Sequence, residues 1–196
     1  MIFKNCTFFN ENFEKEYGDI EIENGKIKQI GILDGEGKDM SGKIIIPGFI
    51  DVHIHGCAGG DASDADKSGL EKMAKELAKH GVTSFCPTSM TLPKEKLENI
   101  VETVKEFKSE SHEGSKVIGI NLEGPFIAMS KKGAQNAEYV RGGTIEEFDD
   151  LYKKSGELVK LITIAPEAFD SEKFINHAKD YTNVSIGHSA ANANEC

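Results

Sequence analysis

The sequence predicts an α/β fold: a partial (β/α)8 barrel of five strands, preceded by a small β-sandwich segment. Three observations lead to this prediction. From Ile44 onward, apolar runs of strand length alternate with amphipathic helical patterns, as expected for a parallel sheet covered by helices. Before Ile44 the chain has the pattern of short strands and turns. The turn after the first apolar strand lacks the Gly-x-Gly-x-x-Gly spacing of an open dinucleotide-binding sheet, which favours the barrel.

The N-terminal segment carries a clear hairpin signal. Residues 19–23 alternate between polar and apolar side chains, and residues 26–30 form the returning strand. Between them, Asn24-Gly25 is typical of a type I′ turn. Ile27 and Ile30 break the strict alternation, so we expect a β-bulge in this hairpin.

The barrel segment is predicted to contain five strands and four helices. The strands span residues 44–56, 82–88, 116–122, 158–165 and 184–188. The helical patterns cover residues 70–78, 93–107, 145–152 and 171–181. Because a complete barrel needs about 250 residues and eight strands, we assign residues 1–46 to part of a β-sandwich domain. Residues 47–196 are assigned to the first half of a barrel.

Composition and charge exclude several classes of protein. A net charge of −10 argues against nucleic acid or an anionic membrane as a partner. No run approaches the ~18 apolar residues of a membrane helix. The four cysteines form no Cys-x-x-Cys pair, which indicates free thiols in a reducing compartment. We therefore expect a cytoplasmic protein.

Metal-capable residues follow alternate strands. His53 and His55 lie two apart at the end of the first strand, so their side chains point to the same side. Glu123 ends the third strand and His188 ends the fifth. In barrel enzymes the site lies at the carboxyl ends of the strands, and alternate strands fill one layer. Imidazoles with one carboxylate suit zinc, iron, nickel or cobalt, so we predict a divalent metal site.

Other polar residues support weaker predictions. Asp51 either orients a ligand or is paired deeper in the barrel, and the sequence favours neither. Glu167, after the fourth strand, is interpreted as structural. Lys131, Lys132 and Arg141 are interpreted as a solvated loop, with a contact to phosphate as the minority alternative.

Five short stretches together resemble a known family. Residues 47–56, Pro-Gly-Phe-Ile-Asp-Val-His-Ile-His-Gly, resemble the opening strand of the amidohydrolase superfamily. Residues 121–126 (Asn-Leu-Glu-Gly-Pro-Phe) and 132–135 (Lys-Gly-Ala-Gln) are more specific. With residues 164–167 and 187–189, they resemble the N-acetylglucosamine-6-phosphate deacetylase family.

The resemblance implies a β-sandwich plus barrel fold, a dimer, and release of acetate from a small phosphorylated amino sugar. It implies that Glu123 and His188 are metal ligands and that His53 and His55 match a pair found in members holding a second metal. One or two divalent ions are thus implied. Ala134 and Gln135 match a position that contacts substrate, where many members have His.

The chain departs from this family in one respect. The second His of the metal site and the acid/base Asp are expected beyond residue 196, so we predict that this chain alone is inactive. Two alternatives remain open. One is another amidohydrolase, dihydroorotase-like or acting on N-acyl amino acids. The other is a non-catalytic, metal-binding half-barrel.

Overall fold

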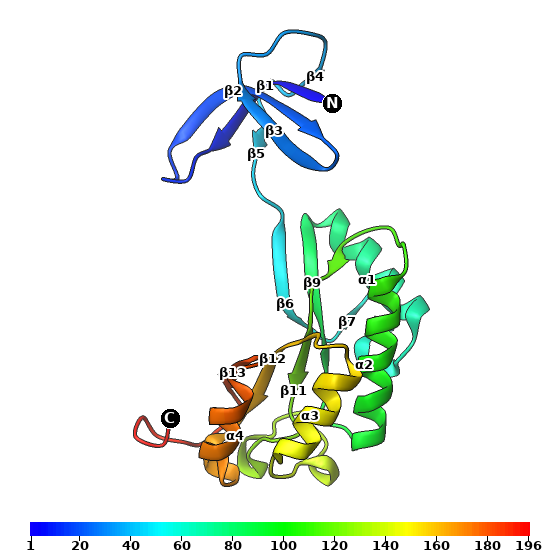
Figure 1. Ribbon diagram of the computed structural model, residues 1–196, viewed down its shortest axis with the longest axis vertical. Coiled ribbons are helices and arrows are strands. Elements are labelled where there is room, and N and C mark those ends of the chain that lie inside the picture. The colour runs from blue at the N-terminus through cyan, green and yellow to red at the C-terminus, as the bar shows by residue number, and fades with distance from the viewer. The chain divides into compact units, whose positions relative to one another are not determined.

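The computed structural model describes residues 1–196 and divides into two compact units, Met1–Pro47 and Gly48–Cys196. The first unit contains strands only, whereas the second alternates strands with helices (Figure 1). No helix in either unit combines the length and hydropathy needed to span a bilayer.

The first unit is one mixed sheet. Its strands are β1 (Ile2–Phe9), β2 (Lys15–Glu23), β3 (Lys26–Gly31), β4 (Lys38–Asp39) and β5 (Ile44–Ile45). Strands β3, β2 and β1 are antiparallel neighbours, and the short β4 and β5 both run parallel to β1. The buried core is small and consists of Cys6, Phe8 and Ile20.

The predicted hairpin is confirmed. Asn24 and Gly25 connect β2 to β3 with φ of +52° and +73°, the two positive values that a type I′ turn requires. The register shifts between Glu21 and Ile22, so the expected bulge is also present. An extra residue in β3 accounts for the broken alternation.

The second unit is a five-strand parallel half-barrel. Its barrel strands are β6 (Phe49–Ile54), β9 (Val82–Ser89), β10 (Lys116–Val117) with β11 (Ile120–Glu123), β12 (Val159–Ile164) and β13 (Asn183–Ile186). Every pairing between them is parallel, and β9 lies between β6 and the β10–β11 strand. Each next strand in the chain therefore lies beside the previous one, which confirms the predicted fold class.

Four helices connect these strands: α1 (Lys67–Lys79), α2 (Lys94–Ser109), α3 (Ile145–Lys154) and α4 (Ser171–Ala178). Asp66 caps α1 by accepting hydrogen bonds from two backbone N–H groups, and Thr144 caps α3 by accepting one from Glu147. Gly81 follows α1 with φ of +80°, the left-handed conformation in which many helices end. A short antiparallel pair, β7 (Gly56–Cys57) and β8 (Gly60–Asp61), precedes α1.

The core of this unit lies between the helices and the strands. It contains α2 side chains from Leu97 to Phe107, strand side chains such as Phe85 and Ile162, and a Phe148–Phe174 contact joining α3 to α4. Each helix buries apolar side chains on one face: Met73 on α1, Ile100 on α2, Leu151 on α3 and Phe174 on α4. Hydrophobic burial therefore attaches each helix to the sheet.

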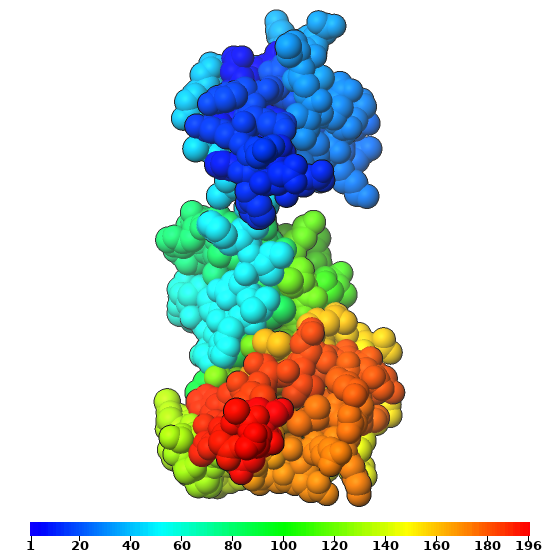
Figure 2. Space-filling model, turned by 90° about the vertical axis from the view of Figure 1, so that its left-hand side faces the viewer, coloured from blue at the N-terminus to red at the C-terminus, as the bar shows by residue number.

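The prediction of one buried strand over residues 44–56 is wrong in two ways. Ile44–Ile45 forms β5 in the first unit, and Pro47, which has no N–H to donate, separates it from β6. Strand β6 pairs only with β9, so Phe49, Ile50 and Val52 remain 50–62% exposed. Figure 2 shows this cyan segment at the surface of the second unit.

Predicted and observed boundaries also differ elsewhere, most clearly in three places. The strand over residues 116–122 is interrupted at Ile118–Gly119, giving β10 and β11. The last helix ends at Ala178 rather than residue 181, and β13 ends at Ile186. His188 therefore lies in the turn after its strand, not in the strand itself.

Candidate metal centre

The carboxyl ends of three alternate barrel strands supply the site. His53 and His55 lie at the end of β6, Glu123 is the last residue of β11, and His188 follows β13. Gly124 lets the chain turn directly after Glu123, with φ of +76°. A Cβ at this position would lie 2.2 Å from Thr91 Oγ1, so only glycine fits.

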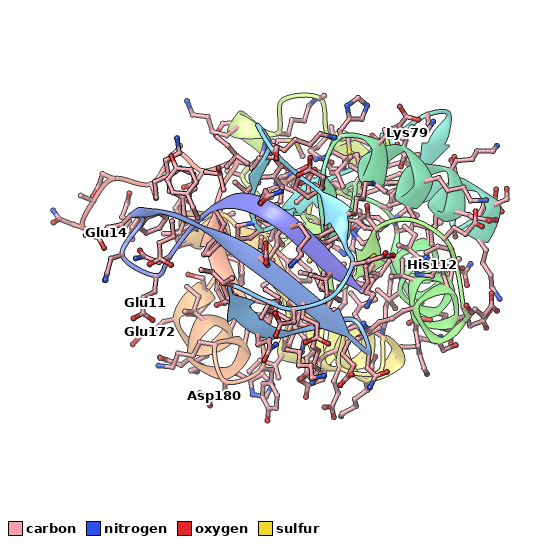
Figure 3. The ribbon with its side chains drawn as sticks, turned by 90° about the horizontal axis from the view of Figure 1, so that it is seen from above. Glu11, Glu14, Lys79, His112, Glu172 and Asp180 are labelled. Atoms are coloured by element: carbon pink, nitrogen blue, oxygen red, sulfur yellow. The ribbon has the colours of Figure 1, made fainter.

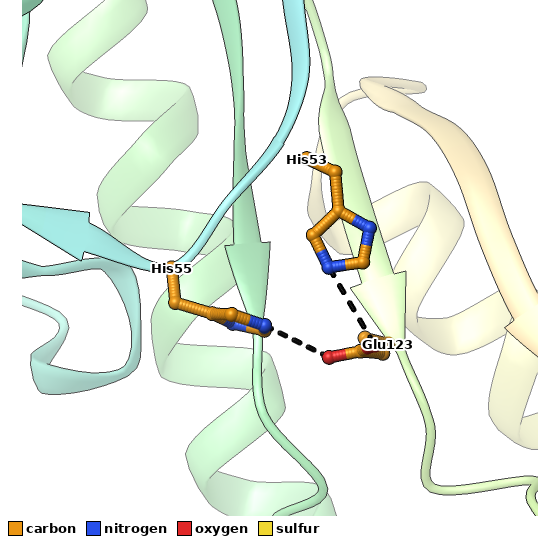
Figure 4. A group of neighbouring side chains, drawn as sticks. All are labelled: His53, His55 and Glu123. Atoms are coloured by element: carbon orange, nitrogen blue, oxygen red, sulfur yellow. Dashed lines mark ion pairs between the residues drawn. The ribbon is translucent and has the colours of Figure 1, made fainter. Parts of the chain in front are cut away.

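The structure brings the three predicted imidazoles to the Glu123 carboxylate, the fourth predicted residue. His55 Nε2 lies 2.8 Å from Glu123 Oε2, while His188 Nε2 and His53 Nε2 lie 3.0 and 3.5 Å from Oε1. Potential ligand atoms of His53, His55 and Glu123 all lie within 4.8 Å of one another (Figure 4). The Glu123 side chain is only 11% exposed, whereas the three imidazoles are 24–45% exposed.

Backbone carbonyls orient two of the imidazoles. His55 Nδ1 lies 3.1 Å from the Thr88 carbonyl oxygen, and His188 Nδ1 lies 2.8 Å from that of Lys131. A carbonyl only accepts hydrogen bonds, so Nδ1 carries the proton in both rings. In a neutral ring, this leaves the Nε2 lone pair facing Glu123, which is the arrangement found in metal-bound histidines.

This arrangement requires positive charge between the rings and the carboxylate. Two neutral imidazoles would point lone pairs at carboxylate lone pairs, so either a ring is protonated or a cation lies between them. The hydrogen bond with Glu123 raises the pKa of His55, and the same bond lowers the pKa of Glu123 to about 2. The donor set therefore fits a divalent ion that replaces the imidazolium proton.

Gln135 contacts the site in a different way from that implied by the family resemblance. Its side chain is buried, its Nε2 donates to Glu123 Oε2 at 2.9 Å, and its Oε1 accepts from the Thr91 N–H at 2.7 Å. Both ends of the amide thus form hydrogen bonds within the chain, and the Nε2 end holds the Glu123 carboxylate. Ala134 is exposed and makes no hydrogen bond through its side chain.

The other polar candidates form hydrogen bonds mainly close to their own positions in the chain or within the loop after β11. Asp51 accepts a hydrogen bond from the His53 backbone N–H at 3.0 Å. The Lys132 Nζ donates to carbonyls of its own loop. The interpretation of Arg141 as a solvated side chain is wrong, because its guanidinium pairs with Glu147 and donates to two backbone carbonyls. Lys131 is exposed, and its backbone carbonyl accepts the hydrogen bond from His188.

Sequence reasoning missed the residues that orient these imidazoles and the Glu123 carboxylate. Thr88 orients His55 through its carbonyl and accepts the Ile54 N–H at 3.0 Å through Oγ1. Thr91 fixes Gln135 through its backbone N–H. The only signal in the sequence is the polar run Thr88-Ser89 at the end of an apolar strand. Backbone donors and acceptors leave no signature in residue identity.

Comparison with known proteins decides the family. The amidohydrolase family profile matches residues 44–192, which include the whole half-barrel and all four residues of the site. The chain belongs to the amidohydrolase family.

The relatives of this amidohydrolase define the homology further. N-acetylglucosamine-6-phosphate deacetylase of Bacillus subtilis is 31% identical over 203 residues, covering 98% of this chain and 51% of the relative. The human enzyme of the same name is 40% identical over 163 residues, covering 80% and 39%. The crystal structure of the Thermotoga maritima deacetylase has a TM-score of 0.84 and 30% identity, covering 100% of this chain and 50% of that one.

These comparisons confirm the resemblance identified from the motifs. The amidohydrolase is a homologue of N-acetylglucosamine-6-phosphate deacetylases and spans about half the length of the curated relatives it matches.

Proposed function

We propose that this amidohydrolase supplies the metal-binding part of a deacetylase that releases acetate from N-acetylglucosamine 6-phosphate, giving glucosamine 6-phosphate. The observation that supports the proposal most directly is that His55 and His188 lie within 3.0 Å of Glu123 at the carboxyl ends of three different strands. Relatives bearing that enzyme name provide the substrate class.

Glu123, His188, His53 and His55 would hold one or two divalent ions, of which zinc, iron, nickel and cobalt suit the donors. When bound, such an ion would provide Lewis-acid chemistry, lowering the pKa of a water molecule and polarising the amide carbonyl of the substrate. The chain's own part is to hold the ligands. The Thr88 and Lys131 carbonyls fix two rings, and Gln135 fixes the carboxylate.

Proton transfer to the leaving amine needs a second group. Among the carboxylates of the chain, only Glu123 lies within ion-pairing distance of the three imidazoles, and it is a proposed ligand. A deacetylase must protonate the amine as the C–N bond breaks. We therefore expect these 196 residues alone to bind metal but to release no acetate from the substrate.

The same observation favours a second candidate function, a metal-binding protein without catalysis. Both candidates place the metal at Glu123. They differ in acetate release: a protein of the relatives' full length would release acetate if it is a deacetylase and none if it only binds metal. A different N-acyl substrate would be revealed in the same assay by N-acetylgalactosamine 6-phosphate and N-acetyl amino acids.

Elemental analysis of the purified chain tests the metal site. We expect about one or two equivalents of a transition metal in the wild type and a clear loss in His188→Ala and His55→Ala. His177→Ala is the matched control, because His177 pairs with Asp149 on the helices, 2.7 Å apart. Equal metal content in all variants, or none in the wild type, would contradict the proposed site.

A further inference from the structure

The turn after β13 holds His188 in an unusual backbone conformation. Its φ is +51°, in the left-handed region that residues other than glycine seldom adopt. Such a conformation persists only where surrounding contacts determine it. The imidazole can meet Glu123 only while this turn is maintained, because β13 has already ended at Ile186.

Two of the contacts come from the loop that contains η2 (Met129–Lys131). The Ala128 N–H donates to the His188 carbonyl at 3.1 Å, and His188 Nδ1 donates to the Lys131 carbonyl at 2.8 Å. A third contact joins the turn to β12, since the Gly187 N–H donates to the Ile164 carbonyl at 3.0 Å. These bonds fix the ring and the residues before it.

The residues after His188 are held by one carboxylate. Glu167, in η4 (Pro166–Ala168) at the end of β12, accepts a hydrogen bond from Ser189 Oγ at 2.7 Å. Its other oxygen accepts the Ala190 N–H at 2.5 Å. Partial desolvation acts to raise the pKa of Glu167, but the bonds from Ser189 and Ala190 outweigh it and lower the pKa.

We propose that Glu167 is a positioning residue for His188: it fixes Ser189 and Ala190 and so keeps the preceding histidine turned toward Glu123. Glu167 itself touches neither imidazole nor carboxylate of the site. Glu167 is thus structural, as interpreted from the sequence, but the turn that it stabilises carries a residue of the proposed metal site. The proposal rests on the metal-binding role of His188 proposed above.

Cobalt titration of the metal-free chain tests this role. Outer contacts of a metal ligand are worth about 10–100-fold in affinity, so we expect Glu167→Ala to bind Co²⁺ that much more weakly than wild type. Its visible absorption spectrum should shift toward that of His188→Ala. Glu167→Gln should recover most of the affinity, because its Oε1 can accept the Ala190 N–H and its Nε2 can donate to the Ser189 hydroxyl. Glu172→Ala is the control, since Glu172 is exposed at α4 and makes no hydrogen bond with its side chain (Figure 3).

A second measurement does not depend on metal. Imidazole ¹⁵N spectra of the metal-free protein report whether His188 Nδ1 keeps its proton and hydrogen bond. We expect these signals to change in Glu167→Ala and to stay unchanged in Glu172→Ala, with similar circular dichroism in both. A wild type that binds no Co²⁺ would overturn the proposed function, whereas the ¹⁵N comparison would still test the position of His188. Unchanged His188 signals in Glu167→Ala would overturn the role of Glu167.

Discussion

Gln135 donates a hydrogen bond from Nε2 to Glu123 Oε2 at 2.9 Å, and this contact links the loop after β11 to the last residue of that strand. The other end of the amide accepts the Thr91 N–H at the end of β9. One side chain thus connects two strand ends through a carboxylate that three histidines also face. Because both partners of Gln135 are buried, removing the amide leaves the Thr91 N–H unpaired and takes one hydrogen bond from Glu123 Oε2, which His55 Nε2 also faces at 2.8 Å.

Replacing Gln135 by Ala should therefore destabilise the chain. The change leaves the Thr91 N–H and one Glu123 oxygen without this partner, which costs about 1–3 kcal/mol of unfolding free energy. Urea denaturation followed by circular dichroism measures the loss. Gln29→Ala, at an exposed position in β3, is the control and should change stability by no more than about 0.5 kcal/mol. Equal stability of the two variants would contradict the bridging role.

The meeting of the four proposed ligand side chains could be predicted from the sequence because it depends on two simple geometric rules. Side chains two apart on a strand share a side, and alternate parallel strands contribute to one layer. His53, His55, Glu123 and His188 needed only these rules and the strand order. The contacts of Gln135 and Glu167 depend instead on how loops fold back, which residue spacing does not encode.

Stability of the metal-free protein should depend on pH through the Glu123–His55 pair. Glu123 has its pKa lowered from 4.5 to about 2, so its contribution is present above pH 4.5 and is lost as pH falls toward 2. His55 has a raised pKa, so its contribution is complete below its ordinary value of 6.5 and is lost as pH rises through the higher folded value.

The pair should consequently stabilise most between pH 4.5 and 6.5, the two ordinary values. The measurement is the difference in thermal midpoint between wild type and Glu123→Gln in chelator across pH 2–9. Taking a difference cancels the pH-dependent stability contributed by other groups with a lowered pKa, such as Asp19 in the first unit, because these groups are the same in both proteins. A difference that does not vary with pH would show that the pair is absent in solution.

The exposure of β6 illustrates what periodicity leaves undetermined. The run from Phe49 to Ile54 is apolar enough for a buried central strand, yet in this chain it pairs on one side only. Whether such a strand is covered depends on neighbours far along the chain. Hydrophobicity therefore predicted a strand at residues 49–54 but neither its start nor its exposure to solvent.

We expect the exposed side of β6 to promote association at high protein concentration. An unpaired strand with apolar side chains favours edge contacts, and lysines on such an edge suppress them. Sedimentation velocity should show mass rising with concentration for wild type and much less for the Ile50→Lys/Val52→Lys double variant. The control places lysine at two other exposed isoleucines, Ile27 and Ile32, in the first unit. Association that is equal in the two double variants would assign the effect to charge alone.

The last prediction concerns the packing of α3 and α4, which hold the outer side of the half-barrel. Phe148 is fully buried, with its ring centroid 5.8 Å from Phe174 on α4 and 5.8 Å from Tyr152 on its own helix. Removing the ring leaves a cavity between two helices that are joined by short connections to β12 and β13. Phe148→Ala should therefore cost about 3–5 kcal/mol of unfolding free energy.

Met129→Ala, at a position 52% exposed in the same unit, is the comparison and should cost about 0.5 kcal/mol or less. Urea unfolding followed by far-ultraviolet circular dichroism gives both values. A similar small cost for both substitutions would show that α3 is not packed on α4 as described. A large cost for Phe148→Ala alone would confirm that this ring packs α3 against α4, the helix that precedes β13 in the chain.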